Sequence, residues 1–316
     1  MLAICPETHD PFFNLAVEDY LLHNRKEDFL ILSVNDPCVI IGKHQVVHRE
    51  VNTMFTEEKK IPVIRRISGG GTVFHDRGNL NFAFIKQSQA GKQVDFRLYA
   101  QPVIDFLSSI GLNVVFKGKN DLTIDGLKIS GNAEHIFRER VLHHGTLLFN
   151  ASLDDMRQSI KAKSDRYFTH AVVSNRTSVT NLKMRLPDIK TIEELRESML
   201  RYFLRSISAL QRFTLSEAEE AAARSLAENK YQTWEWNYGY GPQYTFKNWF
   251  EVNGKACQVH LLVKDGIIWE CKVEGTDDIK AAFKKLIGCR HMYQDLLDKF
   301  HSEAIPVPDA EIIKFF

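Results

Sequence analysis

Three consecutive glycines in the segment 65–76 (RRISGGGTVFHD) constrain the fold of this chain more than any other feature. The apolar run 61–64 before them and the pair Val73–Phe74 after them indicate two buried strands, so the glycines form the turn between these strands. Glycine adopts positive φ angles without strain and lets a ligand approach the backbone closely. Successive N–H groups in such a turn make a concave anion site, and Arg65 and Arg66 suit phosphate or carboxylate. A plain glycine-rich hairpin with two surface arginines is the alternative.

Composition and charge limit the class of protein. The 316 residues carry 41 Lys and Arg against 40 Asp and Glu, and this balance predicts neither a nucleic-acid nor a membrane partner. The five cysteines are odd in number and lack Cys-x-x-Cys spacing, so we expect a reducing compartment rather than disulfides or a zinc site. We see no signal peptide and no apolar stretch of membrane-spanning length, and we therefore expect a cytoplasmic protein.

Strand patterns dominate between residues 112 and 149, with helical patterns on either side. This arrangement predicts an α+β domain with a mixed or antiparallel sheet. Asp10–Pro11 begins the first helix, since Asp is a good N-cap and Pro is favoured at the first helical position. Asp125–Gly126 predicts a two-residue hairpin turn, which places Asp121 and Lys128 near the ends of a tight hairpin.

The pattern changes after the aromatic and glycine-rich segment 234–242, which we interpret as a domain boundary. A three-stranded meander follows, with turns at Asn253–Gly254 and Asp265–Gly266, and two helices come after it. We therefore predict a catalytic domain at 1–242 and a small α+β accessory domain at 243–316.

Several familiar signatures of catalytic sites do not occur in the sequence. It contains neither a Gly-x-x-x-x-Gly-Lys-Ser/Thr loop, nor a dinucleotide fingerprint that opens a helix, nor a Gly-x-Ser-x-Gly elbow. The adjacent His143 and His144 would point to opposite faces of a strand, so we expect one of them in the core or in a polar network. Cys38 lies in an apolar strand and is interpreted as a buried thiol.

What remains is an electrostatic site. Its candidate residues are Arg65, Arg66, the glycines, Asn79, Lys128 and Arg176. Lys128 interrupts an apolar hairpin between Leu127 and Ile129. It is either an outward-facing strand lysine or a point charge that meets a phosphate or carboxylate oxygen.

Several motifs in one order make the whole chain similar to the lipoate–protein ligase A family. They are the segments 65–76, 78–79 (GN), 120–121 (ND), 128–131 (KISG), 144–148 (HGTLL) and 179–182 (VTNL), together with the first-helix residues 10–16 and the boundary segment 234–242. The segment 174–180 departs from the serine- and arginine-bearing loop of the family.

The resemblance implies a catalytic domain with a fold like that of biotin ligases and class II aminoacyl-tRNA synthetases. It also implies a two-step reaction with ATP and Mg²⁺. The carboxylate of lipoate attacks the α-phosphate of ATP to give lipoyl-adenylate and pyrophosphate. A lysine of an acceptor domain then takes the lipoyl group and releases AMP. The implied acceptors are 2-oxoacid dehydrogenase E2 subunits and the glycine cleavage H protein, and the enzyme is expected to be a monomer.

By position, the resemblance also implies the site residues. Those for ATP or the adenylate are Arg66, Ser68, Gly70, Gly71, Thr72, Val73, Phe74, Asn79, Asp121 and Lys128. Those for lipoate are Gly71, His75, Lys128 and His144. Lys128 would be the catalytic residue, and Asp121, with Asn79 and Asn120, would help to place the nucleotide and Mg²⁺. Because the lipoyl chain is apolar, we expect a hydrophobic tunnel lined by the first helix and the strands at 38–41 and 80–84.

Three other functions share part of this pattern. A lipoyltransferase that uses preformed lipoyl-adenylate would share nearly every motif. An octanoyltransferase with a cysteine nucleophile is disfavoured, since the sequence has no cysteine between residues 39 and 256. A non-catalytic lipoate-binding protein is also disfavoured, because it would not need the residues that bind the adenylate. The preference between lipoate and octanoate stays open.

Overall fold

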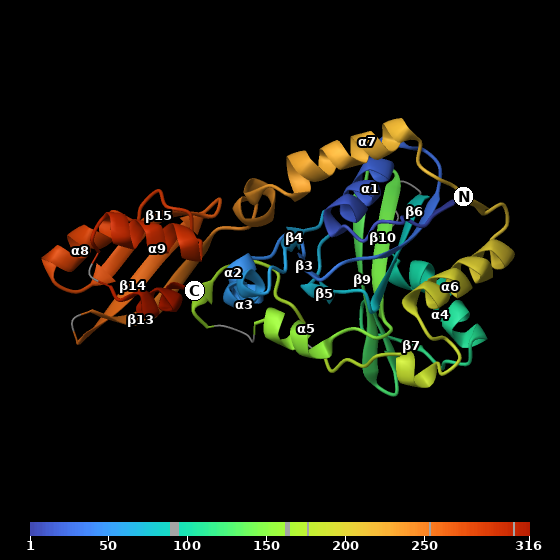
Figure 1. The fold of residues 1–316 in the computed structure, drawn as a ribbon, viewed down its shortest axis with the longest axis horizontal. Coiled ribbons are helices and arrows are strands. Elements are labelled where there is room, and N and C mark those ends of the chain that lie inside the picture. Colours follow the sequence, from blue (N-terminus) through green and yellow to red (C-terminus); the bar gives the residue numbers. More distant parts are fainter. Residues whose placement is uncertain (89–94, 162–164, 176, 253, 306) are drawn as a thin grey trace. The chain divides into compact units, whose positions relative to one another are not determined.

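The computed structural model describes residues 1–88, 95–161, 165–175, 177–252, 254–305 and 307–316, so the predicted contact of Arg176 lies outside the described residues. The chain divides into two compact units, whose elements Figure 1 traces. Unit 1 comprises Met1–Lys43, Ile61–Arg157 and Ser174–Gln232, and unit 2 comprises His44–Lys60, Gln158–Val173 and Thr233–Phe316. The boundary that we predict after residue 242 differs from this division, because two earlier segments pack with the carboxyl-terminal residues.

In the described part of unit 1, eight strands form a mixed sheet in the order β12-β1-β2-β6-β10-β9-β8-β7. The strands are β1 (Leu2–Ile4), β2 (Phe29–Val34), β6 (Asn79–Gln87), β7 (Val115–Lys117), β8 (Asp121–Ile124), β9 (Leu127–Phe137), β10 (Arg140–Leu148) and β12 (Gln211–Arg212). β1 runs parallel to β2 and β12, whereas the other neighbours are antiparallel. This mixture of directions, with the helices below, confirms the predicted α+β class.

Two amphipathic helices, α4 (Phe96–Ser109) and α6 (Ile192–Ser206), supply much of the core of unit 1. Their apolar residues pack in one cluster with Leu32, Phe82 and Phe84 of the central strands. The further helices of this region are α1 (Pro11–Asn24), α5 (Leu153–Ser159), α7 (Glu217–Leu226) and the short η1 (Lys183–Arg185) and η2 (Ala227–Tyr231). The predicted start of α1 is confirmed, because the Asp10 side chain accepts a hydrogen bond of 2.9 Å from the Phe12 N–H.

The two strands that flank the glycines belong to a small sheet with the order β4-β3-β5. These strands are β3 (Cys38–Ile41), β4 (Val63–Arg65) and β5 (Val73–His75). β4 is parallel and β5 antiparallel to β3, so the strands before and after the glycines border a third strand instead of each other. The glycine segment is therefore a crossing loop, and the hairpin alternative is wrong.

The predicted meander forms the sheet of unit 2, in the order β11-β13-β14-β15. Its strands are β11 (Tyr167–Phe168), β13 (Tyr244–Val252), β14 (Lys255–Lys264) and β15 (Ile267–Glu274), and its helices are α2 (Val47–Glu50), α3 (Thr53–Glu58), η3 (Glu235–Gly239), α8 (Asp277–Lys284), α9 (Tyr293–Ser302), α10 (Asp309–Ile312) and η4 (Ile313–Phe315). A second apolar cluster joins the sheet to α8 and α9. Among the described residues, we find no helix with the length and apolarity to cross a membrane.

Candidate functional site

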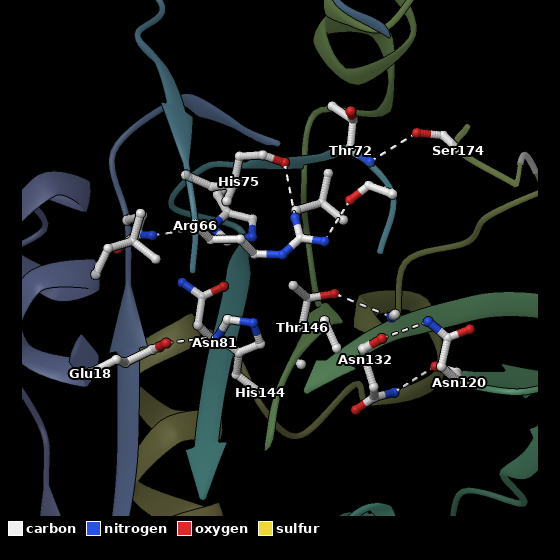
Figure 2. Close-up of a pocket in the computed structure, with 18 of the residues that line it drawn as sticks. Glu18, Arg66, Thr72, His75, Asn81, Asn120, Asn132, His144, Thr146 and Ser174 are labelled. Carbon is white, nitrogen blue, oxygen red and sulfur yellow. Dashed lines mark hydrogen bonds and ion pairs between the residues drawn. The ribbon is translucent and has the colours of Figure 1, made fainter. Parts of the chain in front are cut away.

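A pocket of about 890 Å³, including its open mouth, lies within unit 1, and Figure 2 shows part of its lining. The glycine loop, the hairpin of β8 and β9, the first helix and β10 all contribute to it. Of the predicted site residues, Arg66, Gly71, Thr72, Val73, His75, Asp121, Lys128 and His144 line this pocket. The pocket therefore brings together predicted site residues that are far apart in the sequence.

The Arg66 guanidinium is hydrogen-bonded to several residues of the glycine loop. Its Nη2 donates hydrogen bonds to the Gly69 and Gly71 carbonyls, the latter at 2.8 Å, and its Nε donates to the Ser68 hydroxyl at 2.9 Å. Gly70 has a φ of 88°, which an L side chain would strain. Burial lowers the pKa of Arg66 to about 10, so the guanidinium still carries its charge at neutral pH.

Arg65 makes different contacts from Arg66. Its side chain is buried and donates to the Gly42 and Lys43 carbonyls at 3.1 and 3.0 Å. A Cβ at Gly42 would lie 2.2 Å from the Gly70 carbonyl oxygen, so the two loops touch without a side chain between them. Of the two predicted arginines, Arg66 lines the pocket and Arg65 braces the loop behind it.

A buried acidic residue, which our sequence analysis missed, completes a polar chain along the pocket. His144 Nδ1 lies 2.7 Å from Glu18 Oε2, and His144 Nε2 lies 2.6 Å from the Ser68 hydroxyl that Arg66 also contacts. Glu18 is only 7% exposed although it belongs to a helix. A carboxylate in a helix of mostly apolar residues was the signal for it, and it contributes negative charge close to Arg66.

Lys128 is not an outward-facing strand lysine. Its ammonium lies 2.7 Å from Asp121 Oδ1, and the two side chains are 20% and 16% exposed. The Lys128 backbone also exchanges hydrogen bonds with Ser178 and Thr180, at 2.9 and 3.0 Å. The predicted hairpin is confirmed, since Ile124 pairs with Leu127 across the turn, and it holds the lysine against the pocket.

Asn120 and Asn132 fasten the base of this hairpin. The side chain of each donates to the backbone carbonyl of the other, at 2.5 and 2.9 Å (Figure 2). Behind them, His143 Nε2 lies 3.1 Å from Asn132 Oδ1 and His143 Nδ1 lies 2.6 Å from Glu134. The two adjacent histidines thus point to opposite faces, as predicted, with His143 in a buried polar network and His144 at the pocket.

The other predicted residues, Ser68, Gly70, Phe74 and Asn79, do not line the pocket. The alternation of β5 directs Val73 and His75 to the pocket and Phe74 into the core, where it is 2% exposed. Asn79 is fully buried and donates to Asn81 Oδ1 at 2.8 Å, and it is Asn81 that reaches the pocket. The ligand roles that we predict for these residues stay predictions.

The expected acyl tunnel differs from the structure in its chemistry. The elements that we expected do line the pocket, through Leu15 of the first helix and Ile40 of β3. Beside these apolar residues, however, the wall carries polar ones, namely Asn14, Ser33, Asn35, His75 and Asn81. Their side chains are 3–7% exposed. An apolar acyl chain alone does not account for such a wall.

Ser174 lines the pocket and contacts the glycine loop. The Thr72 N–H donates to Ser174 Oγ at 2.9 Å, and a Cβ at Gly71 would lie 3.1 Å from the same oxygen (Figure 2). The described residues include no group of three or more His, Cys, Asp or Glu side chains that could hold a metal ion. Asp121 nevertheless fits nucleotide-bound Mg²⁺, which uses one or two carboxylates together with phosphate oxygens and water.

Comparison with known proteins agrees with this geometry. Residues 10–204 match the family described as the lipoyl protein ligase A/B catalytic domain. The chain is 36% identical to the lipoate-protein ligase LplJ of Bacillus subtilis over 271 residues. This aligned region covers 84% of this chain and 82% of that protein. Among solved structures, a bipartite lipoate protein ligase from Thermoplasma acidophilum, studied with its E2 lipoyl domain, has a TM-score of 0.65 at 27% identity, over 76% of this chain and 96% of that one. A lipoate-protein ligase A bound with ATP has a TM-score of 0.63 at 27% identity, over 76% and 97%.

Proposed function

The chain belongs to the family of the lipoyl protein ligase A/B catalytic domain, and from this membership we propose that it is a lipoate–protein ligase that activates lipoate with ATP. One observation carries the proposal at the level of the site. A single pocket is lined by Lys128 and Arg66 together with Gly71 and Thr72 of the glycine loop. Lipoate and ATP are both anions, so a site that joins them needs fixed cations and oriented N–H groups.

In the first half-reaction, an oxygen of the lipoate carboxylate attacks the α-phosphorus of ATP. A P–O bond forms to this oxygen, and the bond to the β-phosphate breaks with its electron pair on the departing pyrophosphate. Lys128 lines the pocket, and its ammonium would offset the repulsion between the carboxylate and the α-phosphate. Phosphoryl-type transfer depends mainly on such positioning and charge stabilisation. Arg66 keeps the glycine loop in shape and adds a second positive charge.

Mg²⁺ would accompany the triphosphate and neutralise part of its charge. Asp121 would hold the ion with phosphate oxygens and water, and Asn120 lies beside it. In the second half-reaction, the neutral amine of an acceptor lysine attacks the lipoyl carbonyl carbon. An amide forms, AMP leaves with the electron pair of the broken C–O bond, and the amine loses a proton.

The acceptors are lipoyl domains. A relative of known structure was studied with its E2 lipoyl domain, which supports this class of partner. We extend the proposal to E2 subunits of 2-oxoacid dehydrogenases and to the glycine cleavage H protein. We also propose that the enzyme is a monomer and that it is located in the cytoplasm.

The decisive experiment is lipoate-dependent exchange of labelled pyrophosphate into ATP, with purified protein and no acceptor. Exchange demonstrates that the enzyme activates lipoate itself. If exchange does not occur but the protein transfers lipoate from preformed lipoyl-adenylate to a lipoyl domain, it is a lipoyltransferase. If neither reaction occurs, a thioester-dependent transferase or a binding protein replaces the ligase.

A further inference from the structure

The polar wall of the pocket contains hydrogen-bonding atoms without partners among the described residues. These atoms are Asn14 Oδ1, His75 Nε2 and Asn81 Nδ2, and all three are buried. Their residues are 4%, 7% and 7% exposed, and all three line the pocket. Buried polar atoms in native proteins nearly always have partners, so three without partners on residues that line one pocket indicate a ligand that supplies them.

The hydrogen-bond network determines what each atom offers. Asn14 Nδ2 donates to Asn35 Oδ1 at 2.8 Å, and this leaves Asn14 Oδ1 as an acceptor. Asn35 therefore presents its Nδ2 to His75 Nδ1, at 3.1 Å, so Nδ1 is the acceptor in that pair. Burial, with the nearby Arg66 charge, lowers the pKa of His75 to about 3, so the ring is neutral and carries its proton on Nε2.

Asn81 adds a second donor by the same reasoning. Its Oδ1 accepts from Asn79 Nδ2 at 2.8 Å, and its own Nδ2 therefore remains as a donor. The wall thus offers two donors, His75 Nε2 and Asn81 Nδ2, and one acceptor, Asn14 Oδ1. A hydroxyl group matches these types of atom, because its oxygen accepts two hydrogen bonds and its O–H donates one.

The position of these atoms relates them to one part of the substrate. Figure 2 shows His75 and Asn81 with Glu18 and His144 on one side of the Arg66 guanidinium, whereas Asn120 and Asn132 lie on the other side. Lys128 pairs with Asp121, which precedes Leu122 and follows Asn120 in the chain. An acyl chain whose carboxylate meets Lys128 and that runs past Arg66 would reach the polar wall with its far end.

We propose that His75, Asn81 and Asn14 form a subsite for a hydrogen-bonding group at the remote end of the acyl chain. The inference rests on the proposed function and extends its substrate class. The enzyme accepts medium-chain carboxylic acids with an acceptor atom at the far end and discriminates against acids of equal length with an apolar end. Their activation follows the same balanced step as that of lipoate, with adenylate and pyrophosphate as the products.

A pair of nearly isosteric acids tests the subsite. The probes are 8-hydroxyoctanoate and nonanoate, which differ by a hydroxyl in place of a terminal methyl. With the full chain we expect kcat/KM in ATP–pyrophosphate exchange to be about tenfold higher for 8-hydroxyoctanoate, since nonanoate would leave buried groups unpaired. An apolar tunnel would reverse this order. A ratio at or below one therefore overturns the proposal.

Variants connect the ratio to the named side chains. Asn81→Leu removes one donor at similar size, and we expect the ratio to fall at least threefold. His75→Gln keeps a donor and should retain more of the preference than His75→Phe. Asn24→Leu is the control, because Asn24 is an exposed residue of α1 whose side chain donates to the Tyr20 carbonyl. Each ratio is taken within one variant, so partial unfolding cancels. An unchanged ratio in both Asn81→Leu and His75→Phe refutes the assignment.

Lipoate serves as the positive control in every measurement. If lipoate itself drives no exchange, the proposed function is wrong, and the subsite is then tested by calorimetric binding of the same two acids. Tighter binding of 8-hydroxyoctanoate supports the subsite independently of catalysis. Equal binding overturns it.

Discussion

Replacing Gly42 by alanine tests whether the close contact between two loops maintains the site. The added Cβ would lie 2.2 Å from the Gly70 carbonyl oxygen and 3.3 Å from Arg66 Nη2. A carbon and an oxygen in comfortable contact are about 3.3 Å apart, so the loops have to separate by about 1 Å. The neighbouring bond from the Lys43 N–H to the Ser68 carbonyl, now 2.8 Å, resists that movement.

The magnitude follows from these distances. Overpacking of this kind typically costs about 1–3 kcal/mol of stability. A displacement of about 1 Å in a catalytic site costs about 10²-fold in rate. We therefore expect Gly42→Ala to lower kcat/KM for lipoate-dependent exchange about 100-fold, with a smaller effect on the free energy of unfolding. Gly42 does not have a positive φ, so the change reports the contact and not backbone strain.

Gly69→Ala is the matched control from the glycine run itself. A Cβ there would have no heavy atom within 4 Å, and its φ is not in the left-handed region. We expect activity within about threefold of the unchanged enzyme, far from the ~10²-fold effect of a 1 Å displacement. Unchanged exchange in Gly42→Ala, or an equally large loss in Gly69→Ala, would refute the role of the contact.

Three further outcomes are expected from the same structure. Lys128→Ala should slow both half-reactions by about 10²–10³, the usual effect of one lost electrostatic donor, and near-normal transfer from lipoyl-adenylate would contradict its role. Asp121→Asn should raise the Mg²⁺ concentration for half-maximal exchange by about tenfold or more, as loss of a metal-site partner usually does, and an unchanged Mg²⁺ dependence would exclude this carboxylate as a ligand. Burial lowers the pKa of His291 to about 4, below the ordinary value near 6.5, so the unfolded chain binds the proton more readily. Stability is then complete above about pH 6.5 and declines as the pH falls toward 4, by about 3 kcal/mol from this group, and His291→Gln should flatten the decline in acid titrations followed by denaturant unfolding.

Local chemistry made much of the architecture predictable. The cap at Asp10, the turn at Asp125–Gly126 and the carboxyl-terminal meander depend on residues close in sequence, and each is confirmed. The position of Lys128 near the end of this hairpin was predictable for the same reason. Long-range pairing was less predictable, because nothing local shows that β3 lies between β4 and β5.

The sequence by itself determined that this chain carries a glycine-rich loop, a lysine hairpin and an α+β framework, since each of these depends on short-range backbone preferences. Only the tertiary structure decided which side chains line the pocket and which support it. It separates Arg65, which braces the loop, from Arg66, which lines the pocket. It brings Glu18 to His144 across 126 positions of sequence, and it makes one wall of the pocket polar. Hydrogen bonds between distant strands and helices set these contacts, and a local pattern of residues does not encode them.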